Sequence, residues 1–272
     1  MNFTKMHGIG NDFILIEDLN EQIKNESELA IKVCHRRFGI GADGLVLIRK
    51  SKECDLQMVI INSDGSRPNM CGNAIRCFGK YAYEKGLVKS EKFSVQTGDG
   101  RKDIELYIED SVVKNVKVFM GQESLEGKDI PLADNLEKII NYKMEILNNE
   151  FEINTLLVGV PHTIVIDNKD KFETEFGANI EKNKIFKEGT NVNFVKINDR
   201  NNIIVRTWER GAGKTLACGT GACASARMLN ILNLVDEKVN VTLPGGNLVI
   251  ELEEEGIYMT GPAEYICKGE VL

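Results

Sequence analysis

The stretch NMCGNAIRC at residues 69–77 has a second version, LACGTGAC, at residues 216–223, about half the chain later. In both, a Cys-Gly pair stands before a polar residue and an apolar helical pattern, which predicts a cysteine at the N-terminus of a helix. The backbone N–H groups and the dipole of a helix favour negative charge at that end, and both lower the pKa of a thiol. Cys71 and Cys218 are therefore predicted to be reactive thiols that face each other across a cleft.

The residues after each cysteine follow one order of helix, turn, strand and glycine-rich turn. Helices are predicted over 73–85 and 220–232, and strands over 91–97 and 238–243. Earlier segments also correspond, because residues 11–16 resemble 161–166 and residues 42–48 resemble 191–197. Offsets this similar indicate one duplication, and the period is too long for a solenoid.

We therefore predict two homologous domains, 1–118 and 119–262, with a last strand at 263–272 that completes the first domain. Further strands, rich in β-branched and apolar residues, are expected at 55–62, 112–119, 151–158, 202–208 and 247–252. A helix is expected from an N-cap at Ser27 through Arg37, closed by Gly39, and a short one over 134–141. Many strands and few helices predict an α+β fold, with each domain a barrel-like sheet around its cysteine-led helix.

Composition excludes several classes of protein. The 272 residues are 42% hydrophobic and 28% charged, as in globular proteins, and no apolar run approaches the ~20 residues of a membrane helix. The net charge of −7 argues against a nucleic-acid partner. Seven cysteines without a secretory h-region predict free thiols in the cytoplasm. With no Cys-x-x-Cys pair and three histidines, no metal site is expected.

Three glycine-rich segments imitate nucleotide-binding motifs. Residues 39–44 match G-x-G-x-x-G, but a helix is predicted before them and a strand after them, the reverse of the dinucleotide fingerprint. Residues 219–224 match the looser form outside a βαβ setting. A phosphate loop ending at Gly213-Lys214-Thr215 would need glycine where Trp208 stands. Residues 210–213 are better explained as a flexible loop near a ligand.

Two equivalent cysteines in homologous domains suit a racemase or epimerase. One thiolate removes an α-proton, and a thiol on the opposite face returns one, so the two sides of the site should be alike. The substrate α-carboxylate and its developing enolate would be held by backbone N–H groups of Gly72, Asn73, Gly219 and Thr220. Such a site requires neither pyridoxal phosphate nor a metal.

The sequence resembles the diaminopimelate epimerase family along nearly its full length. The motifs that carry the resemblance are KMHGIGNDF at 5–13, NSDGS at 62–66, MCGNAIRC at 70–77, ERGAG at 209–213, ACGTG at 217–221, LPGG at 243–246 and YMTGP at 258–262. The resemblance implies two barrel-and-helix domains with the site between them, and conversion of L,L- to meso-diaminopimelate by two cysteines without a cofactor. It also implies a homodimer that acts on a small amino acid.

Carried over by position, the resemblance makes Cys71 and Cys218 the acid and base, assisted by His162 and Glu209. It assigns substrate contacts to Asn11, Asn62, Asn73, Asn191 and Arg210. Arg210 suits bidentate capture of the distal carboxylate. The other cysteines and histidines are expected to be structural or superficial: Cys34, Cys54, Cys77, Cys223, Cys267, His7 and His35.

Two positions depart from the family pattern. Gly44 stands where some members have glutamine, and Val160 stands where asparagine commonly precedes Pro-His. Val160 leaves open another cofactor-independent amino-acid racemase, such as a histidine racemase. A fold relative that isomerises small acids would lack the cysteine pair, and a thiol redox or binding protein would show no α-proton exchange.

Overall fold

The computed structural model describes residues 1–133 and 136–271 and divides into two compact units. The first contains Met1–Phe119 and Thr260–Leu272, and the second contains Met120–Met259. Among the described residues, the helices are all too short or too polar to cross a bilayer.

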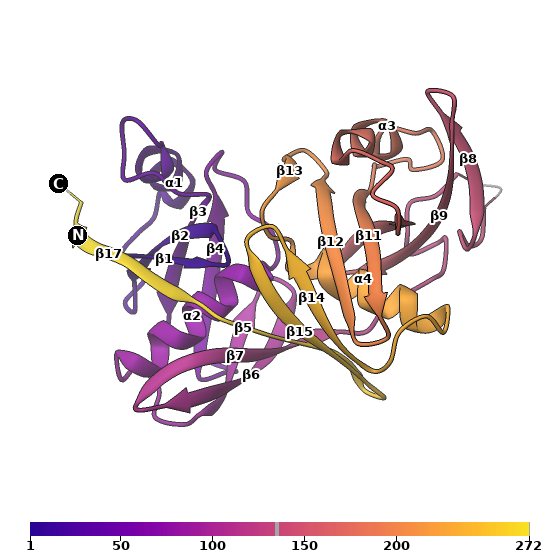
Figure 1. The fold of residues 1–272 in the computed structure, drawn as a ribbon. Helices are drawn as coiled ribbons and strands as arrows, with labels where there is room; N and C mark the ends of the chain where they lie inside the picture. Colours follow the sequence, from indigo (N-terminus) through magenta and orange to yellow (C-terminus); the bar gives the residue numbers. More distant parts are fainter. Residues whose placement is uncertain (134–135, 272) are drawn as a thin grey trace. The chain divides into compact units, whose positions relative to one another are not determined.

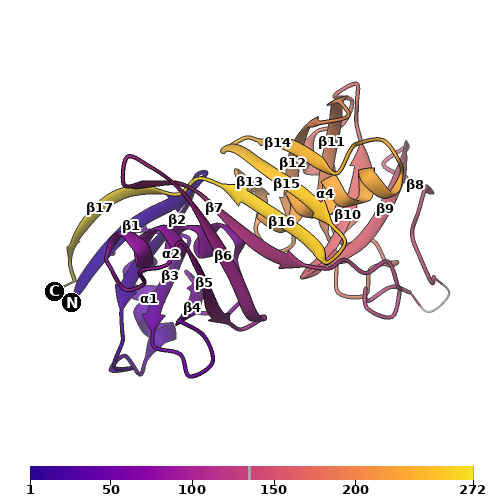
Figure 2. The same cartoon turned by 90° about the horizontal axis from the view of Figure 1, so that it is seen from below.

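The first unit is a strongly curved set of strands with two helices (Figure 1). The last strand, β17 (Glu264–Glu270), pairs antiparallel with the first, β1 (Asn2–Gly8), and the Met1 ammonium group donates to the Val271 carbonyl at 3.0 Å. Figure 2 shows β17 beside β1. The elements are β1 (Asn2–Gly8), β2 (Asn11–Glu17), α1 (Glu26–Cys34), β3 (Gly44–Arg49), β4 (Leu56–Asn62), α2 (Gly72–Glu84), β5 (Lys92–Thr97), β6 (Gly100–Glu109), β7 (Val112–Gly121) and β17 (Glu264–Glu270).

The second unit repeats this plan. β2–β3 is parallel, β3–β4 antiparallel, β4–β5 parallel and β5–β6 antiparallel. In the second unit, β10 (Val160–Ile166) pairs with β11 (Asn191–Asp199), β11 with β12 (Asn202–Glu209), β12 with β14 (Lys238–Leu243) and β14 with β15 (Gly246–Glu253), with the same directions in the same order. The elements are β8 (Tyr142–Ile146), β9 (Asn149–Val158), β10 (Val160–Ile166), the 3-10 helix η1 (Thr174–Phe176), α3 (Gly177–Glu181), β11 (Asn191–Asp199), β12 (Asn202–Glu209), β13 (Gly213–Thr215), α4 (Gly219–Ile231), β14 (Lys238–Leu243), β15 (Gly246–Glu253) and β16 (Gly256–Gly261).

Each unit wraps its strands around one central helix, so the predicted α+β fold of two pseudo-symmetric domains is confirmed (Figure 1). α2 contacts β1 to β4 and β6, and α4 contacts β9 to β12, β14 and β15. Every residue of α2 from Gly72 to Ala82 is buried. A helix that is covered on all sides needs small residues where strands come close, as at Gly79, where an added Cβ would lie 3.2 Å from Val116.

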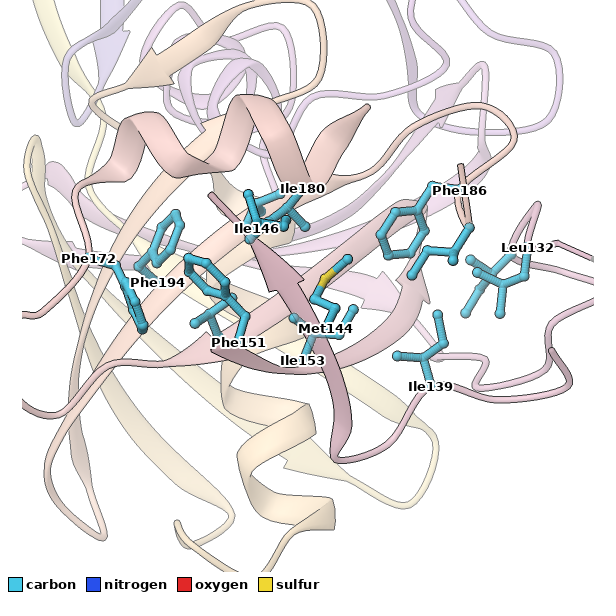
Figure 3. Packing of buried hydrophobic residues seen from close by; sticks show 14 residues of the cluster. Leu132, Ile139, Met144, Ile146, Phe151, Ile153, Phe172, Ile180, Phe186 and Phe194 are labelled. Carbon is cyan, nitrogen blue, oxygen red and sulfur yellow. The ribbon is translucent and has the colours of Figure 1, made fainter. Parts of the chain in front are cut away.

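A second layer covers the outer face of each sheet. In the first unit, Ala30, Val33 and Cys34 of α1 pack on Ile14 and Leu47. In the second, the chain around η1 and α3 closes over β8 to β11, and Figure 3 shows Phe151, Phe172 and Phe194 clustered there. The cysteine-led helices therefore lie inside each sheet, with a separate apolar core outside it.

Most predicted elements are confirmed, and two helices are corrected. The helix expected from Ser27 to Arg37 is α1, Glu26–Cys34, with Asn25 as its N-cap. It ends early because the His35 Nδ1 atom accepts the Arg37 and Phe38 N–H groups. The helix expected over 134–141 is wrong for 136–141, where the carbonyls of Glu137 and Ile139 accept from Gly127 and Thr155 instead; 134–135 lie outside the described residues.

Candidate active site

Cys71 and Cys218 occupy the same local position in their units, as N-caps of α2 and α4. Their backbones are extended, with φ/ψ of −141°/119° and −121°/104°. The Cys71 carbonyl accepts from Ile75 N and the Cys218 carbonyl from Ala222 N, each at 3.0 Å. Each helix therefore begins with the glycine after the cysteine, and the first N–H groups point out of the helix end beside the thiol.

In the first unit two hydrogen-bonded amide side chains, those of Asn11 and Asn73, lie at the Cys71 end of the helix. The Asn11 Oδ1 atom lies 3.9 Å from Cys71 Sγ and accepts from Asn73 Nδ2 at 3.0 Å. Asn11 Nδ2 donates to Asp43 Oδ2 at 2.6 Å. Since a carboxylate only accepts, this bond fixes the amide with its oxygen toward Cys71.

Arg76 holds the start of α2 from inside the fold. Its fully buried guanidinium donates to Gly72 O at 2.9 Å, Asn73 Oδ1 at 3.0 Å and Pro262 O at 3.1 Å. Gly8 lies directly against it, because an added Cβ would approach Arg76 Nη2 to 2.9 Å. The backbone beside Cys71 is thus held by a charge with several acceptors.

Asn62 ends β4, opposite Gly44 at the start of β3. Its Nδ2 donates to Ser66 Oγ at 2.9 Å, within the turn that Gly65 makes with φ of +87°. The Gly44 Cβ position is only 2.9 Å from Ile61 O, which accounts for glycine there in this chain. Asn62 therefore has a turn role here, at the same edge of the sheet as Asn11.

In the second unit the thiol is more enclosed. Cys218 is 5% exposed, and its Sγ lies 3.6 Å from Thr220 Oγ1. Gly221 follows in the first turn, and a Cβ there would lie 2.4 Å from Asn193 Oδ1 and 3.1 Å from Cys218 Sγ. The α4 end therefore packs on β11 too closely for any side chain at position 221.

His162 lies near the start of β10, opposite Asn191 of β11. It is completely buried, and its Nδ1 lies 3.2 Å from Asn193 Nδ2. Burial, and then the positive charge of Arg210, lower its pKa to about 3. The ring is therefore neutral at physiological pH.

The loop after β12 is held by Asn191. The Asn191 Oδ1 atom accepts from Arg210 N at 2.8 Å, and Nδ2 donates to Pro161 O at 3.2 Å. The Arg210 guanidinium donates to Glu188 O at 2.7 Å, while Glu209 Oε1 accepts from Thr215 Oγ1 at 2.6 Å. Together these bonds place a carboxylate and a guanidinium next to each other in sequence at the end of β12.

The structure thus groups the candidate residues within each unit. In the first unit Asn11, Asn73 and Cys71 are in contact, with Asn62 on the neighbouring strand end. In the second, His162 and Asn191 are paired in the sheet, and Asn191 holds Arg210. The backbone of the predicted carboxylate donors, Gly72, Asn73, Gly219 and Thr220, forms the first turns of α2 and α4.

Sequence reasoning missed three residues that hold the site: Asp43, Arg76 and Asn193. In the sequence, Asp43 belongs to a glycine-rich segment that resembles a nucleotide-binding motif and to the repeated segment 42–48, and neither pattern indicates a site role for it. The alternation Asn191-Val192-Asn193 was a usable signal, because it places two amides on one face of a strand. The first imitation motif is accounted for by packing, since a Cβ at Gly39 would lie 2.3 Å from Lys32 O.

The remaining cysteines have surroundings unlike those of the two N-caps. Burial raises the pKa of Cys34 and of Cys77 to about 12. Cys223 is buried within α4, Cys54 is half-buried, and Cys267 is exposed on β17. Among the described residues, no three His, Cys, Asp or Glu side chains gather in a way that would hold a metal ion.

Comparison with solved structures gives the fold. A hydroxyproline epimerase from Agrobacterium vitis, solved with bound trans-4-hydroxy-L-proline, matches with a TM-score of 0.74 at 14% identity, over 99% of this chain and 91% of that one. A PhzF-family phenazine biosynthesis protein from Bacillus anthracis matches with a TM-score of 0.72 at 16% identity, over 100% of this chain and 99% of that one.

Comparison of sequences gives the family. The family model described as diaminopimelate epimerase matches residues 3–126 and 155–266. A diaminopimelate epimerase of Clostridium perfringens is 56% identical over 274 residues, covering 100% of both chains. One from Caldanaerobacter subterraneus is 46% identical, covering 100% of this chain and 99% of the relative. With the model matching both halves and relatives aligned from end to end, the chain belongs to the diaminopimelate epimerase family.

Proposed function

We propose that the protein inverts one α-carbon of L,L-diaminopimelate to give the meso isomer, a step in lysine and cell-wall precursor synthesis. Support for the substrate comes from the 56% identical relative that covers the whole chain. The observation that carries the reaction type is the repeated N-cap: Cys71 and Cys218 precede Gly72 and Gly219 with the same extended backbone and the same first helical bond.

The reaction needs one thiolate and one thiol on opposite faces of the substrate carbon. The thiolate takes the α-proton and becomes S–H, and the electron pair left on carbon delocalises into the α-carboxylate. The second cysteine then gives its S–H proton to the other face and becomes the thiolate. The product of one direction is the substrate of the other, so the two cysteines exchange roles. Positioned acid–base groups contribute about 10²–10⁴-fold each.

The carboxylate gains negative charge as the proton leaves. Backbone N–H groups at Gly72, Asn73, Gly219 and Thr220 are the donors we assign to it, because they begin α2 and α4 next to the thiols. Helix N-termini suit anions, and one such donor is commonly worth about 10²–10³-fold in rate. This chemistry calls for neither pyridoxal phosphate nor a metal.

Side chains divide the remaining work. We assign Asn11 and Asn73 to contacts with the substrate near Cys71. We also assign a substrate contact to Asn62, which lies at the same end of the sheet. Arg210 takes the distal carboxylate, for which its planar guanidinium is suited. Asn191 holds the Arg210 backbone and offers its second amide hydrogen to the substrate.

The second unit also supplies the two assisting residues. His162 is neutral and buried near the start of β10, and Glu209 ends β12 next to Arg210. We assign both to orienting the reacting end of the substrate. Their position at one edge of the sheet supports this, since β10 begins and β12 ends there.

The proposal is tested by incubating the reduced protein with L,L-diaminopimelate in D2O, with no added cofactor, and following the α-proton signal by NMR. We expect the signal to disappear as the meso isomer forms. Folded protein with titratable free thiols that leaves the α-proton in place would refute diaminopimelate as the substrate.

Val160 favours one alternative. This residue, rather than the asparagine common in the family, precedes Pro161-His162 at the start of β10. An apolar side chain there removes a polar contact for the far end of a substrate, which leaves a histidine racemase as the second candidate. α-Proton exchange of L-histidine but not of L,L-diaminopimelate would establish it.

We further propose a cytoplasmic homodimer. Support for the compartment is the cysteine usage of the sequence, seven residues with no Cys-x-x-Cys pair, which fits a protein of the reducing cytosol. Tyr265 and Ile266 of β17 are 40% and 49% exposed, which gives the first unit apolar side chains for a second copy. Sedimentation equilibrium at micromolar concentration should give twice the monomer mass, and a monomer mass would refute the dimer.

A further inference from the structure

His162 presents one nitrogen to the protein and leaves the other without a protein partner. Its Nδ1 is hydrogen-bonded to the Asn193 side chain, whereas Nε2 is buried and has no hydrogen-bond partner among residues 1–133 and 136–271. A buried polar atom without a partner costs about 1–3 kcal/mol. A native fold that accepts this cost commonly does so for a functional reason, and the tautomer of the ring decides what that nitrogen can do.

The orientation of the Asn193 amide determines the tautomer. Asn193 Nδ2 lies 3.2 Å from His162 Nδ1 and 3.4 Å from the Thr163 carbonyl oxygen. On its other side, Asn193 Oδ1 accepts from Thr207 Oγ1 at 2.9 Å. A carbonyl oxygen can only accept, so the NH2 group must face Thr163 and with it the histidine. The Nδ1 atom of His162 is therefore an acceptor, and the ring proton resides on Nε2.

We propose that Asn193 is a positioning residue that holds His162 as the neutral Nε2–H tautomer, so that the imidazole offers a hydrogen-bond donor to the substrate. The part that concerns the substrate rests on the proposed function, whereas the tautomer does not. In this state Nε2 cannot take a proton, so His162 is not a base. The partner of Nε2 must be an acceptor, and an oxygen of a carboxylate or of its enolate-like form fits.

The same amide also touches the helix that carries Cys218. A Cβ added at Gly221 in α4 would lie 2.4 Å from Asn193 Oδ1 and 3.1 Å from Cys218 Sγ. Asn193 thus joins the histidine to the N-cap turn within one unit. Burial opposes protonation of the ring, and the positive charge of Arg210 adds to this effect.

The tautomer is measured on the full-length protein without substrate. The chain has three histidines, so a protein labelled with 15N-histidine gives a simple long-range 1H–15N spectrum, and His162→Gln assigns the signal. We expect a protonated Nε2 and an unprotonated Nδ1 that do not titrate between pH 6 and 9. A proton on Nδ1, or an imidazolium with a pKa near the ordinary ~6.5, would overturn the proposal.

Asn193→Asp tests the consequence. A carboxylate accepts from Nδ1–H, so the tautomer should invert or the ring should become charged, and kcat should fall by at least about 10-fold; a wrong histidine tautomer can cost up to ~10⁴-fold. The control is Asn154→Asp, a buried amide on the adjacent strand β9. An inverted tautomer with unchanged kcat would refute the functional part. The wild-type spectrum decides the tautomer even if the variant does not fold.

Discussion

The two units have the same strand order and the same helix start, but different side chains at the strand ends. At the starts of β2 and β3 the first unit has Asn11 and Asp43, which orient an amide oxygen toward Cys71. Near the starts of β10 and β11 the second unit has His162 and Asn193, which orient an imidazole. In both, a group that can only accept fixes an amide. Duplication therefore preserved the position of the thiol, while each unit acquired its own polar groups around it.

The largest effect should come from the thiols themselves. Cys71→Ala and Cys218→Ala should each lower epimerisation by about 10³-fold or more, because each removes one of the two proton-transfer groups. Cys77→Ala and Cys223→Ala are the matched controls, since both cysteines are buried in the same two helices. Steady-state rates of meso product formation measure this. Near-normal rates in either N-cap variant would end the equivalence of the two sites.

The third residue after each cysteine differs between the two helices, and substitutions there should change the stability of the protein by different amounts. Gly221→Ala should destabilise the protein by about 1–3 kcal/mol through overpacking on Asn193, although an alanine normally stabilises a helix. Ala74→Gly, at the equivalent place in α2, should cost only about 1 kcal/mol. Urea unfolding compares them. Adding Asn193→Gly should recover part of the Gly221→Ala loss, and strict additivity would show that the two residues do not interact.

Asp43→Asn should lower kcat/KM through a change that is confined to the first unit. The variant can donate to Asn11 and so allows the Asn11 amide to turn, which exchanges the oxygen near Cys71 for NH2. We expect kcat/KM to fall by about 10-fold, or ~1.4 kcal/mol. Asp103→Asn is the control, because Asp103 forms an exposed ion pair with Arg101. Equal rates for the two variants would show that the Asn11 orientation is not needed.

The last prediction concerns stability in acid and not the rate of the reaction. His162 has a pKa of about 3 in the folded protein, and an unfolded histidine has one near 6.5. Between these values the unfolded chain binds a proton that the folded one does not, so stability falls as pH decreases from about 6.5. His162→Gln should flatten this decrease by up to ~1.4 kcal/mol per pH unit. Unfolding curves at pH 7, 6 and 5 measure it, and an unchanged slope would contradict the assignment.

The parts of the fold that depend on residues close together in sequence could be predicted from the sequence. The bounds of α2 and α4 follow within one residue from the Cys-Gly start and the turn at their ends. α1 was predicted too long because the His35 side chain competes for backbone N–H groups. The segment 136–141 has an apolar pattern typical of a helix, but its carbonyls accept from Gly127 in a turn and from Thr155 in β9.

The same distinction holds for the site. Cys71 and Cys218 could be found from their own neighbours in sequence, whereas the roles proposed for His162 and Glu209 needed the family resemblance. Asp43 and Asn193 were missed because their importance lies in contacts with residues distant in sequence. Asp43 acts on Asn11, 32 positions away, and Asn193 on His162, 31 positions away. Such pairings depend on strand register, which composition and periodicity do not specify.

The origin of the hydrogen in the first product shows whether two different groups remove and return the proton. L,L-diaminopimelate is mixed with the protein in D2O, and the reaction is stopped at low conversion for NMR and mass analysis. Two bases predict a meso product with deuterium at the inverted carbon, while the remaining L,L substrate still carries hydrogen. A product that retains its original hydrogen at that carbon would mean that one group removes and returns the same proton, and would contradict proton transfer by two cysteines.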